Sequence, residues 1–135
     1  MITGACLCGE VRFAVDGELG QVSHCHCSMC RRVHGAAFGT YASVPRQNFR
    51  WTSGAELVRT FRSSDAMERT FCERCGSTLQ AIFEVEPEVY YLTLGTLDGD
   101  PQCRPSVHIF VGSKAPWYEI IDNLPQFEEW TDEAG

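Results

Sequence analysis

The spacing of its eight cysteines constrains this 135-residue chain more than any other feature. They are Cys6, Cys8, Cys25, Cys27, Cys30, Cys72, Cys75 and Cys103. Seven of them fall into three short clusters, and Cys103 stands apart. Such a density would suit a disulfide scaffold in a secreted chain, whereas in a reducing compartment the same clustering indicates metal binding.

The first and last clusters are pairs in which the second cysteine precedes a glycine. They are Cys6-Leu7-Cys8-Gly9 and Cys72-Glu73-Arg74-Cys75-Gly76. Structural zinc takes four ligands in a tetrahedron, commonly all thiolate, and the two pairs together supply four. A spacing of one residue would suit one face of a strand, and glycine accepts the positive φ of a tight turn. Disulfides within or between the pairs, or four free thiols, are the alternative.

The middle cluster, Cys25-His26-Cys27-Ser28-Met29-Cys30, offers three thiolates within six residues. Three protein ligands and one exchangeable position are typical of catalytic zinc. One Zn²⁺ and three thiolates carry a net charge of −1. A short helix is expected from Ser28 to Gly35, and its positive N-terminus would face that charge. The alternative is a second structural zinc with a fourth protein ligand. The candidates are His24, His26, His34, His108 and Cys103.

The rest of the chain predicts one mainly β domain over residues 1–135, with short helices. β-rich segments alternate with Gly, Pro, Asp and Ser, which mark turns. Expected strands cover residues 11–15, 39–44, 57–61, 66–71, 78–85, 89–94 and 107–111, and residues 118–123 are expected to form a turn or two of helix. The aromatic tail with Trp117, Tyr118, Phe127 and Trp130 is expected to cover the core or to form a homodimer contact.

Charge and hydropathy limit the partners and the location that can be expected. The formal net charge is −7, which disfavours a nucleic-acid partner because an acidic surface repels phosphate backbones. No apolar run approaches the length of a membrane span, and the first residues lack the pattern of a signal peptide. These observations predict a cytoplasmic protein that is not attached to a membrane.

Several motifs together resemble the family of glutathione-dependent formaldehyde-activating enzymes. The matching segments are residues 4–13 (GACLCGEVRF), 25–32 (CHCSMCRR), 71–77 (FCERCGS), 108–110 (HIF), 113–117 (SKAPW) and 124–127 (LPQF). The resemblance implies the family's zinc-bearing β-tent fold, built of small antiparallel sheets. It also implies a structural zinc on Cys6, Cys8, Cys72 and Cys75, and a catalytic zinc on Cys25, Cys27 and Cys30.

The activity that this resemblance implies is a carbon–sulfur lyase of the S-(hydroxymethyl)glutathione synthase type. Its substrates would be a glutathione-like thiol and an aldehyde such as formaldehyde. Arg31 and Arg32, beside the middle cluster, are candidates for binding the substrate's carboxylates, with plain surface charge as the alternative. A general base could be His26, His34 or His108, and the sequence does not choose among them.

Two other functions remain open at this point. A non-catalytic zinc module that binds another macromolecule would have a saturated second site, and the same domain occurs in a centromere-associated protein. The acidic charge and the lack of a basic tail disfavour chromatin as the partner. A thiol-based redox or metal sensor would instead release zinc when Cys25, Cys27 and Cys30 are oxidised.

Overall fold

The structure, a computed structural model, describes residues 1–131, and strands dominate it. The strands are β1 Ile2–Ala5, β2 Arg12–Val15, β3 Val22–Cys25, β4 Gly39–Pro45, β5 Phe49–Ser53, β6 Val58–Ser64, β7 Met67–Cys72, β8 Thr78–Phe83, β9 Val89–Thr93 and β10 Val107–Ile109. The α-helix α1 covers Ser28–His34, and short 3₁₀ turns cover Arg46–Asn48, Ala55–Leu57, Leu94–Thr96 and Val111–Ser113. The mainly β class predicted from the sequence is confirmed.

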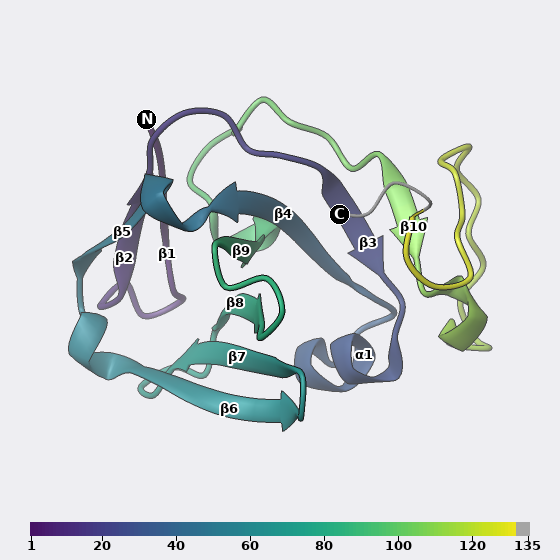
Figure 1. Ribbon diagram of the computed structural model, residues 1–135, viewed down its shortest axis with the longest axis horizontal. Helices are drawn as coiled ribbons and strands as arrows, with labels where there is room; N and C mark the ends of the chain where they lie inside the picture. The colour runs from purple at the N-terminus through teal and green to yellow at the C-terminus, as the bar shows by residue number, and fades with distance from the viewer. Residues whose placement is uncertain (132–135) are drawn as a thin grey trace.

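The strands form two sheets. A three-stranded antiparallel sheet has the order β1-β2-β5, and a seven-stranded sheet has the order β10-β3-β4-β9-β8-β7-β6. In the larger sheet only β10 and β3 pair in parallel, and the other described neighbours are antiparallel. In Figure 1 the small sheet lies at one end of the molecule, β10 and the segment after it lie at the other end, and α1 lies between them, near β3 and β7.

Alternating apolar side chains of β2 meet the large sheet in the core between the two sheets. The cluster contains Val11, Phe13, Val15, Val44, Leu79 and Leu92, all almost fully buried, together with Cys6 and Cys72. Burial of such side chains contributes roughly 1.5–3 kcal/mol each. Two of the predicted zinc ligands are therefore part of the main core.

The expected strands match β2, β4 and β6 to β10, with ends displaced by a few residues. β1, β3 and β5 were not expected. The predicted helical turn over residues 118–123 is wrong, because the structure has no helix in that segment. The backbone just after it approaches β10, where the amide of His108 donates to the carbonyl of Pro125 at 2.9 Å. Within residues 1–131, no helix has the length and apolar character to cross a bilayer.

Gly35 ends α1 in the left-handed region, with φ 59° and ψ 41°, and its amide donates to the carbonyl of Arg31. A Cβ at this position would meet no atom within 4 Å, so an alanine would be disfavoured by the backbone alone. We expect Gly35→Ala to lower the free energy of unfolding by about 1 kcal/mol in urea titrations. Gly95→Ala is the matched control, because Gly95 is equally open but has no positive φ. Equal effects at both positions would contradict this explanation.

Candidate metal centres and the adjoining cavity

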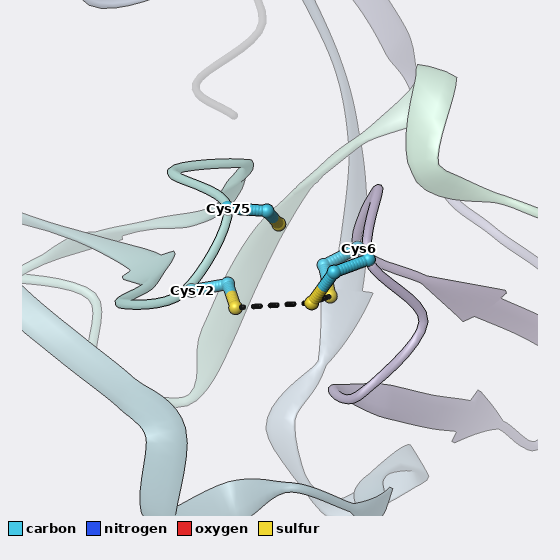
Figure 2. A group of neighbouring side chains, drawn as sticks. Cys6, Cys72 and Cys75 are labelled. Carbon is cyan, nitrogen blue, oxygen red and sulfur yellow. Dashed lines mark hydrogen bonds between the residues drawn. The ribbon is translucent and has the colours of Figure 1, made fainter.

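The four cysteines of the first and last clusters come together between two turns. Cys6 and Cys8 follow β1, Cys72 is the last residue of β7 and Cys75 lies in the turn after it, yet all four sulfur atoms lie within 4.8 Å of one another. The Sγ atoms of Cys6 and Cys8 are 3.5 Å apart, and those of Cys8 and Cys72 are 3.9 Å apart. Figure 2 shows the sulfurs of Cys6, Cys72 and Cys75 directed toward a common space.

These separations fit tetrahedral zinc. Four sulfurs at about 2.3 Å from one ion lie about 3.8 Å from each other, close to the observed values. All eight cysteines of the chain are free thiols, which argues against the disulfide alternative. The donor set and its spacing therefore suit a Zn²⁺ ion held by four thiolates.

The two turns have the same local construction. The amide of Gly9 donates to the carbonyl of Cys6 at 3.1 Å, and the amide of Gly76 donates to the carbonyl of Cys72 at 2.8 Å. Gly9 has φ +80° and Gly76 has φ +79°, as the sequence predicted for glycines after each pair. The expectation that Cys6 and Cys8 lie on a strand is wrong, because β1 ends at Ala5 and both residues lie in the turn.

The middle cluster forms where β3 ends and α1 begins. Cys25 is the last residue of β3, Cys30 lies in the first turn of α1, and the sulfurs of Cys25, Cys27 and Cys30 lie within 4.8 Å of one another. The helix cap is Cys27, whose Sγ accepts from the amide of Cys30 at 3.3 Å. The predicted cap at Ser28 is thus one residue late. The sulfur of a candidate metal ligand therefore also caps the helix.

The three thiols of this cluster cannot all ionise without a compensating cation. Hydrogen bonds from the thiols of Cys25 and Cys30 lower the pKa of Cys27 to about 2. The interaction with Cys27 and Cys30, together with burial, raises the pKa of Cys25. A bound divalent cation would allow all three to be thiolates, so the donor set fits Zn²⁺ here as well.

Arg69 on β7 supplies a buried positive charge next to this cluster. It is only 3% exposed, and its guanidinium donates to the Sγ of Cys30 at 3.6 Å and to the hydroxyl of Tyr41 at 2.9 Å. The Tyr41 hydroxyl also forms a 2.6 Å hydrogen bond with Nε2 of His34. Sequence reasoning missed Arg69 and Tyr41, because they are 39 and 11 residues from Cys30 and belong to no local motif.

A cavity of about 260 Å³ adjoins the three-cysteine cluster. Cys25, Cys27 and Cys30 line one part of it, and aromatic and aliphatic side chains line most of the remainder. Arg69 and Tyr41 also reach its wall. Arg31 is partly exposed, Arg32 is exposed, and neither lines the cavity. Carboxylate binding by these two arginines therefore stays a prediction.

None of the candidate fourth ligands joins the three sulfurs. Within residues 1–131, no histidine, carboxylate or further cysteine lies close enough to all three of them to complete the group. His26 and His108 are buried and share a 2.8 Å hydrogen bond, and His108 also contacts Asp122. Burial and the nearby His108 lower the pKa of His26 to about 4. Cys103 belongs to neither cysteine group.

The fold and these clusters define a small β protein with two separate groups of cysteines that could each hold a metal ion. The chain belongs to the family described as glutathione-dependent formaldehyde-activating enzyme, whose profile matches residues 1–113. The resemblance seen in the sequence motifs is thereby confirmed.

Individual relatives agree with this membership. A Halomonas elongata protein that carries the family's name provisionally is 29% identical over 127 residues, covering 89% of this chain and 81% of its own. An uncharacterised lyase of Schizosaccharomyces pombe is 24% identical over 124 residues, covering 92% of this chain and 88% of its own. A crystal structure of a Rhodobacter sphaeroides protein matches with a TM-score of 0.62 and 27% identity, over 73% of this chain and 89% of that one.

Proposed function

We propose that this protein catalyses the reversible joining of a thiol and an aldehyde, such as glutathione and formaldehyde, as a zinc-dependent carbon–sulfur lyase. In the joining direction the sulfur forms a bond to the carbonyl carbon, the π pair of the C=O bond moves to oxygen, and that oxygen takes up the proton the thiol loses. In the reverse direction the same bond breaks, and an aldehyde and a thiol leave. No oxidant or reductant is needed.

The observation that carries the proposal is the difference between the two cysteine groups. The four-cysteine group supplies every ligand that a tetrahedral ion needs. The group of Cys25, Cys27 and Cys30 supplies three and lies on the wall of a cavity. A site that lacks one protein ligand and faces a cavity has room for a substrate atom.

Two zinc ions per chain would fit this arrangement. Cys6, Cys8, Cys72 and Cys75 would hold the structural ion, and Cys25, Cys27 and Cys30 would hold the catalytic one. The catalytic Zn²⁺ would supply Lewis acidity toward a substrate sulfur or carbonyl oxygen. We also propose that the protein works in the reducing cytoplasm, which is consistent with its eight free cysteines.

Arg69 would balance the charge of the loaded site. Three thiolates and one Zn²⁺ carry −1, and the guanidinium beside Cys30 carries +1, so the buried group as a whole is neutral. Its hydrogen bond also fixes the orientation of a ligand sulfur. Arg69 is therefore a positioning residue for Cys30.

We expect Arg69→Met to weaken zinc binding at the three-cysteine site by about tenfold to a hundredfold, the usual effect of losing a partner of a ligand. Competition with a chromophoric chelator measures this zinc affinity. The zinc affinity of the four-cysteine site should be unchanged. Arg50→Met, at an exposed arginine paired with Asp16, is the control. Equal zinc affinity in the Arg69 variant and the wild type would contradict the charge-balancing role.

A path for the proton leads from the cavity through Tyr41 to His34. The Tyr41 hydroxyl accepts a hydrogen bond from Arg69. When the His34 ring is neutral and protonated on Nδ1, the Tyr41 hydroxyl donates its proton to Nε2 of His34. Burial, and then the charge of Arg69, lower the pKa of His34 and favour the neutral ring. The adduct's hydroxyl proton could thus pass to Tyr41 Oη while Tyr41 passes its own to His34.

The proposed activity is tested by two-dimensional exchange NMR on equilibrium mixtures of glutathione and ¹³C-formaldehyde. The expected result is a faster interconversion of free formaldehyde and S-(hydroxymethyl)glutathione with zinc-loaded wild-type protein. An interconversion rate equal to the protein-free rate, with glutathione and with other thiols and aldehydes, would overturn the proposed function. The protein-free sample is essential because this addition is easy without a catalyst.

A further inference from the structure

The cavity beside the three cysteines is much larger than a one-carbon aldehyde requires. Formaldehyde has two non-hydrogen atoms, and a water molecule, which has one, takes up about 30 Å³ of liquid, whereas the cavity measures about 260 Å³. Most of this space must therefore accommodate another part of the substrate. The side chains around it indicate what chemistry that part has.

Apolar side chains make up most of the wall away from the sulfurs. Met67, Ala81, Phe83, Ile109, Phe110 and Trp130 come from β7, β8, β10 and the segment after β10. Phe83 stacks edge-on against Tyr91 and Trp130, with ring centroids 5.4 Å apart in each case. Such a wall contributes to affinity by removing hydrocarbon from water. The polar groups that also line the cavity, among them Gln21, Ser23, Ser43 and Ser64, are uncharged.

Charges on the cavity wall are scarce. Among residues 1–131, Arg69 is the one charged side chain that lines the cavity. Its two terminal nitrogens donate to the Sγ of Cys30 and to the hydroxyl of Tyr41, and its buried Nε has no hydrogen-bond partner. Glutathione carries two carboxylates and an ammonium group, and burying any of them without a partner is costly. The cavity therefore suits a different occupant from the charged arms of glutathione.

We propose that the adduct handled at this site carries an uncharged, apolar group of about benzyl size, which fills the cavity while the reacting carbon and sulfur lie at the three cysteines. This inference rests on the proposed function and specifies its substrate class. The apolar group could belong to the thiol or to the aldehyde, since both are joined in the adduct.

Binding of two matched thiols to zinc-loaded wild-type protein tests the cavity itself. Benzyl mercaptan and 4-(mercaptomethyl)benzoate differ only in one carboxylate, remote from the sulfur. By calorimetric titration we expect the uncharged thiol to bind at least tenfold more tightly than the carboxylate, and more tightly than glutathione. Equal affinity for the matched pair, or tighter binding of glutathione than of benzyl mercaptan, would overturn the inference.

A pair of phenylalanine variants locates the contact. Phe83→Ala removes an aromatic ring from the cavity wall and is expected to weaken benzyl mercaptan binding about tenfold. Phe61→Ala makes the same change at a 63% exposed position on β6 that does not line the cavity, and should leave binding unchanged. If Phe83→Ala does not fold, Met67→Leu serves as a milder change at the wall, with an expected loss of about twofold. Unchanged binding in the folded wall variant would contradict the assignment.

Exchange NMR with two substrate pairs identifies which partner carries the apolar group. Acceleration of benzyl mercaptan with formaldehyde would assign it to the thiol, and acceleration of glutathione with benzaldehyde would assign it to the aldehyde. Acceleration of glutathione with formaldehyde alone would overturn the inference and leave the proposed function standing. Preferential binding of benzyl mercaptan without acceleration of any pair would overturn the proposed function, while the apolar preference of the cavity would stand.

Discussion

Replacing Cys72 by serine should remove one zinc ion and unfold the protein at ambient temperature. Cys72 is fully buried in the main core, where it joins the turn after β7 to the turn after β1. A structural zinc site contributes about 10–16 kcal/mol in isolated zinc-binding peptides, and whole domains are stable by only about 5–15 kcal/mol. Loss of half of the site's contribution, about 5–8 kcal/mol, would remove most or all of the stability of a domain in the lower half of that range.

Circular dichroism and metal analysis on the purified variant measure this effect. Cys103→Ser is the matched control, since Cys103 is half-buried but belongs to neither cysteine group, and this variant should keep both zinc ions and the fold. A Cys72→Ser protein that retains two zinc ions and a cooperative unfolding transition near that of the wild type would contradict a structural role for the four-cysteine group.

Replacing Cys27 by serine should have the opposite pattern, with loss of activity and little loss of stability. Cys27 is half-buried, whereas Cys25 and Cys30 are buried, so the substitution exposes no core. A serine at this position can still cap α1, because its hydroxyl accepts the amide of Cys30 as the sulfur does now. The helix should therefore remain, while the metal loses one of three ligands.

The expected measurements are one zinc ion per chain in place of two, a melting temperature within a few degrees of the wild type, and a loss of thiol–aldehyde exchange of at least about a hundredfold. Ser28→Ala, at the exposed first residue of α1, is the control and should leave all three quantities unchanged. A Cys27→Ser protein that unfolds would make this group structural. Full exchange activity in the variant would remove the three-cysteine group from the proposed mechanism.

The sequence predicted the parts of this molecule that depend on local spacing. The three cysteine clusters, the positive φ of Gly9 and Gly76, and a short helix beside Cys27 follow from residues a few positions apart, and the glycine after each pair suggested that the first and last clusters share one site. The strands that alternate clearly, such as Arg12–Val15, were also found. In each of these cases a few neighbouring residues determine the local backbone.

Features that depend on distant parts of the chain were not predictable in the same way. β3 reads Val-Ser-His-Cys, which has no strand pattern, and it is held by pairing with β4 and, in parallel, with β10. Arg69 and Cys30 are far apart in the sequence. The fold of the large sheet brings Arg69 on β7 within hydrogen-bonding distance of Cys30 in the first turn of α1. Arg31 and Arg32 were the nearest cations in sequence, but Arg69 is the one on the cavity wall.

The central claim is that Cys25, Cys27 and Cys30 hold a zinc ion with one position left for a substrate. A crystal structure of the zinc-loaded protein with benzyl mercaptan, with data collected at the zinc absorption edge, tests it most directly. We expect two zinc ions per chain, one bound by Cys6, Cys8, Cys72 and Cys75, and one bound by the other three cysteines and the sulfur of the added thiol. A second ion enclosed by a fourth side chain of the protein, or a zinc-replete protein with no ion at these three cysteines, would contradict the claim.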